Sequence, residues 1–122
     1  MADIKKEFVI DSEALRAAEI RAQESIKARV VDMFTVKPID EECVIDCAKQ
    51  TGAVVTAENC FINGSLGSAV CEVLCECCPT PVKRVGVWDE FGEVGSIDYL
   101  KNRFGLTAAH IVEAVKEVIA KK

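Results

Sequence analysis

Two glycine-containing loops hold the polar residues of this chain that are best placed for chemistry. The first loop extends from Glu58 to Gly67 and the second from Asp89 to Gly95, and each follows a β-branched run and precedes a predicted helix. The free N–H groups and the positive dipole end of a helix N-terminus can hold an anion such as phosphate. We therefore predict candidate anion-binding or interface loops, with these residues in them: Glu58, Asn63, Gly64, Ser65, Gly67, Asp89, Phe91, Gly92 and Gly95.

The spacing in the first loop does not match the common phosphate-binding motifs. Gly64 and Gly67 lack the G-x-G-x-x-G pattern of dinucleotide folds, and no Gly-Lys-Ser/Thr run is present. Two glycines that permit a tight turn from strand to helix are the simpler explanation. Glu58, at the end of the preceding strand, is placed to reach this loop or a neighbouring subunit.

The second loop combines carboxylates with aromatic side chains. Asp89, Glu90 and Glu93 lie beside Trp88 and Phe91. Paired carboxylates act as acid and base only where burial separates their pKa values. Because these polar positions are expected to face solvent, a solvated or interface loop is favoured. Phe91, a large apolar side chain in a surface loop, is predicted to anchor a partner or the domain itself.

Cysteine is the most unusual residue in the composition. An odd number of cysteines without a secretion signal argues against a disulfide framework. Their i, i+4 and i, i+7 spacings favour free cysteines packed on helix faces in the core. The alternative is a metal or thiol-redox site built on Cys71, Cys75, Cys77 and Cys78, although one helix end closes a tetrahedral site poorly. The seven cysteines are Cys43, Cys47, Cys60, Cys71, Cys75, Cys77 and Cys78.

Two single residues complete the candidates for chemistry. Cys60 is predicted in a loop before a helix N-terminus, where a thiolate is stabilised, so it is a possible reactive thiol. His110 is the one histidine of the chain. It falls near the start of the last predicted helix, away from the apolar stripe, and no Ser or Cys nucleophile is tied to it, so a surface position is predicted.

Length and charge exclude several classes of protein. The chain of 122 residues suits one domain, residues 1–122, and carries a formal charge of −5 with scattered Lys and Arg. A nucleic-acid-binding protein would show a basic stripe, so that partner is not expected. No apolar run approaches the roughly 20 residues of a membrane span, and the N-terminus lacks the pattern of a signal peptide. We therefore expect a cytoplasmic protein without membrane contact.

The order of predicted elements indicates the fold class. Strands alternate with helices, which points to an α/β fold with a mostly parallel open sheet and helices on both faces. Asp40 and Thr107 are predicted N-caps, and Gly52 and the Pro79–Pro81 stretch are predicted stops. Strands are expected at 7–10, 28–33, 53–56 and 82–87, and helices from residue 12, after Asp40, at 66–77, at 96–103 and after Thr107.

Three segments carry a resemblance to a known family. Their order and spacing look like the C-terminal domain of transketolase over roughly residues 12–120, and favour it over related thiamine enzymes such as the β part of 2-oxoacid dehydrogenases. The resemblance implies a three-layer α/β/α sandwich whose mostly parallel sheet includes one antiparallel strand. The segments are Lys27–Asp40 (KARVVDMFTVKPID), Glu58–Val70 (ENCFINGSLGSAV) and Arg84–Ser96 (RVGVWDEFGEVGS).

The resemblance also implies that the catalytic functions of the enzyme lie in other domains. Transketolases transfer a two-carbon ketol unit between sugar phosphates, as in the pentose phosphate pathway, with thiamine diphosphate and a divalent metal (Mg or Ca). The family's Gly-Asp-Gly run is missing here. Members of the family use several histidines to handle the substrate, whereas this chain has one histidine. No catalytic, cofactor-binding or metal-binding residue is therefore expected in this chain. Its expected partners are the N-terminal transketolase domains or subunit, in a homodimer that this domain helps to form.

The sequence departs from the family pattern at two places. The usual Ala-Thr-Gly turn after the first strand is missing, because Phe8–Ser12 (FVIDS) runs almost directly into a helix. Cys60 stands where related domains often have His. Two alternatives to an assembly role stay open: a freestanding regulatory module that binds a small anion at Gly64–Gly67, and a cysteine-based metal or redox protein.

Overall fold

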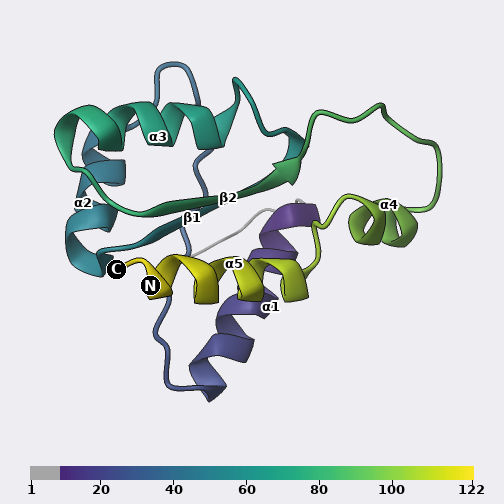
Figure 1. Cartoon of the computed structure of the whole chain (residues 1–122), viewed down its shortest axis with the longest axis horizontal. Helices are drawn as coiled ribbons and strands as arrows, with labels where there is room; N and C mark the ends of the chain where they lie inside the picture. Colours follow the sequence, from purple (N-terminus) through teal and green to yellow (C-terminus); the bar gives the residue numbers. More distant parts are fainter. Residues whose placement is uncertain (1–8) are drawn as a thin grey trace.

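A small parallel sheet lies between two layers of helices (Figure 1). The computed structural model describes residues 9–122. Helices α2 and α3 cover one face of the sheet, and α1 and α5 cover the other. This arrangement is the predicted α/β/α sandwich. The elements are α1 (Val9–Gln23), α2 (Glu41–Thr51), β1 (Val54–Phe61), α3 (Leu66–Cys77), β2 (Val82–Val87), α4 (Ile97–Arg103) and α5 (Ala108–Ala120).

The two strands run parallel and are joined by the crossover helix α3. Val54 pairs with Val82, and the register continues to Ala57 opposite Val85. An irregularity follows before Phe61 pairs with Val87. Because both strands run in the same direction, their carboxyl ends meet at one edge, and the two candidate loops both begin there (Figure 1).

Local capping marks several helix boundaries, as predicted at Asp40 and Gly52, whereas the predicted cap Thr107 precedes α5 without a side-chain bond to its backbone. An oxygen of the Asp40 carboxylate accepts a hydrogen bond from the Cys43 N–H at 3.0 Å, which satisfies a free donor of α2. Gly52 ends α2 with a left-handed φ of 72°, a conformation that favours glycine. The Ser96 hydroxyl accepts from the Tyr99 N–H at 3.2 Å at the start of α4.

Two apolar clusters hold the layers together, one on each face of the sheet. Burial of these side chains, at about 25 cal/mol for each Å² removed from water, is the main stabilising contribution. The cluster between the sheet, α1 and α5 contains Ala17, Val85, Leu106, Ala108, Ile111, Val112 and Ala114. The cluster between the sheet, α2 and α3 contains Val44, Ala48, Val70, Val73 and Leu74.

Two predicted strands are not strands in the structure. Residues 7 and 8 of the first lie outside the described residues, while Val9 and Ile10 begin α1. Residues 28–33 form no ladder, because the described sheet consists of β1 and β2 and neither pairs with this segment. Arg29 in this segment instead donates from Nη1 to Asp46 Oδ2 and to Gln50 Oε1 on α2, each at 2.9 Å. The antiparallel strand expected from the resemblance is absent from the described residues, where the one antiparallel contact is the isolated bridge between Val36 and Ile39.

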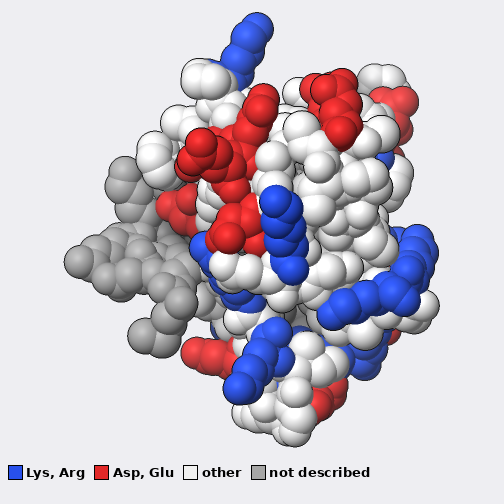
Figure 2. All heavy atoms as spheres, turned by 90° about the vertical axis from the view of Figure 1, so that its left-hand side faces the viewer, with Lys and Arg blue, Asp and Glu red and all other residues white. Residues whose placement is uncertain are grey.

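Charges of both signs share the surface seen from the α2 side. Figure 2 shows acidic side chains gathered in the upper part of this face and basic ones across its middle and lower parts. Arg29 and Asp46 form one ion pair of α2 at 2.9 Å. Neither sign covers the whole face. Over the described range, no helix has the length and apolar character needed to cross a membrane.

Candidate functional site

The Glu58 carboxylate lies against the N-terminus of α3, as predicted from its position before the loop. Its Oε2 accepts from the Leu66 N–H at 2.9 Å, and its Oε1 accepts from the Gly67 N–H at 3.3 Å. The residue is 5% exposed. The chain's own carboxylate therefore occupies the N–H groups that could have held a phosphate.

Gly67 is required by its neighbours. A Cβ at this position would lie 2.9 Å from Thr56 Oγ1 and 2.9 Å from Arg84 Cδ, closer than side-chain contacts allow. Its glycine thus permits α3 to approach β1 and β2 closely, which brings the helix N-terminus within reach of Glu58. Gly67 therefore reflects close packing, whereas Gly64, with a φ of 80° and open space around it, serves the turn that the simpler interpretation predicted.

Cys60 belongs to β1 and not to the loop in which it was predicted. The prediction ended the strand at residue 56, whereas β1 continues to Phe61. The Cys60 Sγ lies 3.0 Å from Ser65 Oγ and donates to Glu58 Oε2 at 3.5 Å, and the residue is exposed. Reactive thiols lie beside cationic groups, and the charged contact of Cys60 is a carboxylate. Its reactivity stays a prediction.

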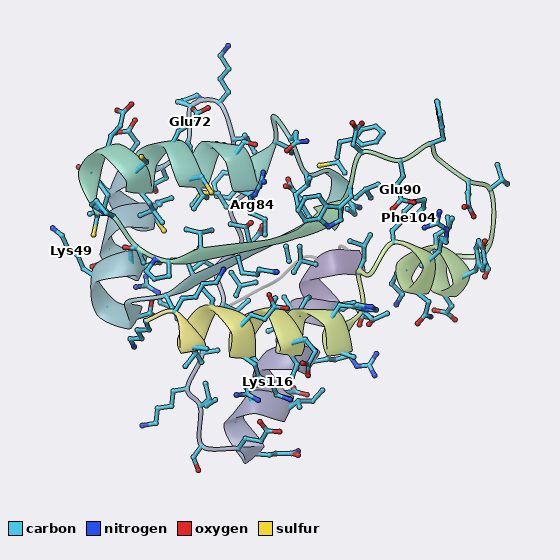
Figure 3. All side chains as sticks on the ribbon, in the orientation of Figure 1. Lys49, Glu72, Arg84, Glu90, Phe104 and Lys116 are labelled. Atoms are coloured by element: carbon cyan, nitrogen blue, oxygen red, sulfur yellow. The ribbon has the colours of Figure 1, made fainter. Side chains whose placement is uncertain are left out.

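The remainder of the first loop is satisfied by its own hydrogen bonds. Arg84 lies between β2 and α3 (Figure 3) and donates from Nη1 to the Ile62 carbonyl at 3.0 Å and to Asn63 Oδ1 at 3.5 Å. The Gly64 N–H donates to Ser68 Oγ at 2.8 Å, with a φ of 80° that favours glycine at this position. These bonds fix the loop's shape without a ligand.

Two of the three carboxylates of the second loop, Glu90 and Glu93, are bound to α4. Arg103 donates from Nη2 to Glu90 Oε2 at 2.7 Å and from Nε to Glu93 Oε1 at 2.9 Å. The Tyr99 hydroxyl donates to Glu93 Oε2 at 2.7 Å, which lowers the pKa of Glu93 and raises the pKa of Tyr99. Because these groups are exposed, they lack the burial that would make an acid and base pair.

The second loop presents apolar side chains to solvent. Phe91 is 96% exposed, and Val94 is fully exposed. Gly92 and Asp89 are also exposed. Gly95 is required locally, since a Cβ there would lie 2.6 Å from the Tyr99 ring. The loop and α4 extend away from the sheet (Figure 1), so this predicted interface loop is an exposed projection of the fold.

Glu13 was missed by the sequence analysis. It is 3% exposed and accepts from Lys101 Nζ and from the Ala108 N–H, both at 2.7 Å. These bonds join α1 to α4 and to the N-terminus of α5, and the Lys101 bond is the main cause of the lowered pKa of Glu13. The partners are 88 and 95 positions away in sequence, so no local pattern could have indicated them.

The cysteines do not form the predicted buried set. Cys60, Cys75 and Cys77 are exposed, and the other four are half-buried. The packing prediction is therefore wrong for Cys75 and Cys77, which lie on the outer side of α3. Within residues 9–122, no three His, Cys, Asp or Glu side chains lie close enough together to hold a metal ion.

His110 and a cavity beside β1 lie apart from the two loops. His110 is exposed, as predicted, and its Nδ1 lies 2.6 Å from Thr107 Oγ1. A cavity of about 370 Å³ lies between the edge of β1, the helices α1, α2 and α5, and residues 26–33. None of the predicted site residues lines it.

Known proteins resemble this chain over nearly all of its length. The family description of the transketolase C-terminal domain matches residues 10–111. A 6-deoxy-6-sulfo-D-fructose transketolase subunit from Clostridium sp. (strain MSTE9) is 56% identical over 114 residues, which are 93% of this chain and 35% of the relative. A 1-deoxy-D-xylulose-5-phosphate synthase from Heliobacterium modesticaldum is 38% identical over 106 residues, 86% of this chain and 16% of the relative.

A solved structure shares both the fold and the sequence. It is a split-gene transketolase described as an inactive beta4 tetramer, with a TM-score of 0.88 and 48% sequence identity. The match covers 92% of this chain and 37% of that chain. This chain therefore spans about a third or less of the length of these relatives.

Proposed function

This chain belongs to the transketolase C-terminal domain family, and from that premise we propose that it serves as the C-terminal domain or subunit of a thiamine-diphosphate-dependent transketolase. Its role is assembly and dimer packing, while companion domains carry out the ketol transfer. Because this chain spans only 35% of its Clostridium relative, the proposal requires further domains, on the same or on a separate polypeptide.

The proposal rests on the hydrogen bonds and ion pairs that the candidate carboxylates make within this chain. Glu58 caps α3, and Glu90 and Glu93 bind Arg103. Three of the four carboxylates that suggested catalysis or ligand binding are thus engaged in holding the chain's own loops, while Asp89 is exposed. An assembly role needs loops of fixed shape, whereas catalysis needs polar groups aimed at an open site.

The described residues do not fit the divalent-metal part of a thiamine diphosphate site. A divalent metal such as Mg or Ca is held by several oxygen ligands, and no such cluster occurs between residues 9 and 122. The proposed cofactor and metal are therefore assigned to the companion domains. Asp89 stays an exposed loop residue in this account and receives no catalytic role.

The family and the Clostridium relative point to two different substrate classes. Sugar phosphates are the substrates implied by the transketolase family, in the cytoplasmic pentose phosphate pathway. The Clostridium relative is named for 6-deoxy-6-sulfo-D-fructose, and its 56% identity favours a second possibility. We propose that the complete enzyme acts on a phosphorylated or a sulfonated ketose, and that both classes belong in one assay.

An activity assay on the native material tests this function. The protein is purified from the cells that produce it, and each fraction is assayed for ketol transfer with a sugar phosphate and with 6-deoxy-6-sulfofructose. We expect activity to elute with this chain, to disappear when thiamine diphosphate and metal are removed, and to return when both are added. Fractions that contain the chain but no such activity would contradict the proposal.

A further inference from the structure

A projecting arm of the chain carries the largest exposed apolar side chains of the two loops. We define the arm as residues 88–103, which form the second loop and α4. Phe91 and Val94 are almost wholly exposed, and Trp88 and Ile97 are more than half exposed. Phe61, at the end of β1, is also more than half exposed and pairs with Val87 next to the arm. Solvent exposure on this scale is costly unless a partner covers the patch.

The arm has little support from the body of the domain. Helix α4 buries no residue, and within the described chain its backbone packs against no other helix or strand. The Lys101 bond to Glu13 attaches it to α1. Because α4 buries no residue, hydrophobic packing within this chain does not fix its position.

The shape of the arm is nevertheless set in advance by polar bonds. Arg103 binds both Glu90 and Glu93, and Tyr99 binds Glu93 from the same helix. Figure 3 shows Glu90 on the loop beside α4. These bonds hold the loop against α4 and leave Phe91 and Val94 facing outward. A surface arranged before binding loses less conformational entropy when a partner docks.

We propose that the outer face of the arm is the docking surface for the companion transketolase domains. This inference rests on the proposed function and names the surface and the chemistry of its partner. The partner presents an apolar depression for Phe91 and Val94, bordered by basic side chains. The basic border complements the arm, which carries four acidic residues and two basic ones: Asp89, Glu90, Glu93, Asp98, Lys101 and Arg103.

The charge of the arm also favours the companion domains over a second copy of this chain as the molecule that binds it. Two copies that met arm to arm would bring acidic surfaces together, which opposes association. In the relatives, by contrast, the part outside the matched region is about twice as long as the matched region itself. The companion domains are therefore the occupant that agrees with the length of the relatives, while the like charge of two arms opposes a second copy.

Site-directed photo-cross-linking in the producing cells tests the docking surface. A benzophenone amino acid replaces Phe91 in one variant and Phe34 in the control. Phe34 is a suitable control because it is 87% exposed and lies outside the arm, before α2. We expect position 91 to cross-link to peptides that mass spectrometry assigns to the remaining transketolase domains, whether these lie on a separate polypeptide or on the same one, and position 34 to give no such product. A cross-link from position 91 to a second copy of this chain would overturn the inference.

A pair of substitutions gives a second measurement. With the companion domains supplied as a separate polypeptide, Phe91→Ser combined with Val94→Ser should reduce the companion that elutes with the chain about tenfold or more, as expected for anchor residues. Phe34→Ser should leave it unchanged, and circular dichroism should show both variants folded. Undiminished co-elution of the double variant would refute the arm as the surface while leaving the proposed function intact. Wild-type chain that elutes alone would refute both.

Discussion

The Glu58 carboxylate lies where an anion would sit if the loop before α3 were a ligand site. It is almost fully buried and accepts hydrogen bonds from the N–H groups of Leu66 and Gly67. A negative charge at a helix N-terminus is favourable through both these bonds and the helix dipole. The same geometry that makes a phosphate site in other proteins thus serves as a helix cap in this one.

Removal of the Glu58 carboxylate should destabilise the fold and create an anion site. We expect Glu58→Ala to lower the free energy of unfolding by about 1–2 kcal/mol, measured by urea denaturation, because two donors of α3 lose their acceptor. Glu72→Ala is the matched control, since Glu72 is exposed on the same helix.

The effect of phosphate on the melting temperature then distinguishes the helix-cap role of Glu58 from the anion-binding alternative. Inorganic phosphate should raise the melting temperature of the Glu58→Ala variant and leave that of the wild type unchanged. If the wild type gains as much stability from phosphate as the variant, the freestanding anion-binding module becomes the better account.

Glu13 should make stability depend on pH in the acid range. Its folded pKa lies below the ordinary value of 4.5, mainly because of the Lys101 bond, so its contribution is present above that value and is lost as pH falls through the folded pKa. We expect Glu13→Gln to lower the free energy of unfolding at neutral pH by about 2 kcal/mol. The difference from the wild type should shrink in acid, and a difference that stays constant with pH would be evidence against this role.

The cysteines should differ in their rates of modification. Burial, followed by the neighbouring Cys43, raises the pKa of Cys47. In the native protein, an aromatic disulfide reagent should therefore modify exposed Cys60, Cys75 and Cys77 before Cys47, as followed by mass spectrometry of peptides. Stoichiometric zinc that protects Cys75 and Cys77 from the reagent would instead revive the metal hypothesis.

At the scale of elements, the arm owes its shape to one arginine. Arg103→Ala removes both ion pairs to the loop, at Glu90 and Glu93. Amide hydrogen exchange over residues 88–96 should then become faster, while the midpoint of urea unfolding moves little, because α4 buries no residue. Unchanged exchange in the loop would show that these pairs do not hold it. Lys116→Ala, which removes an exposed pair on α5, is the control.

Elements with strong local signals were predictable from the sequence. Asp40, Gly52 and Ser96 mark helix ends by capping, and the run Pro79–Pro81 separates α3 from β2. Capping uses bonds within one helical turn, so its pattern is visible in a few residues. The predicted ranges of α3 and β2 agree with the structure for this reason.

Elements that depend on distant contacts were less predictable. The β-branched run at 28–33 reads as a strand, yet Arg29 attaches it to α2 through Asp46. The strand β1 continues to Phe61 because β2 supplies a partner there. The Glu58 contact was predictable because the N–H groups that it caps lie eight and nine residues away, just beyond the loop. The bond from Lys101 to Glu13, by contrast, crosses most of the chain.

At the scale of the whole molecule, the fold is one part of a larger enzyme in its relatives. Matched proteins extend well beyond this chain, and one solved relative is a tetramer of its subunit. The described residues form an α/β/α sandwich with an exposed arm. These features are those expected of a domain that completes an assembly.

Native mass spectrometry of the complex purified from the producing cells tests this account most directly. The chain alone has a mass of 13.3 kDa. The account predicts a larger species in which this domain is accompanied by the remaining transketolase domains, identified by peptide sequencing. A folded species of 13.3 kDa, free of any transketolase partner under conditions that preserve complexes, would contradict it.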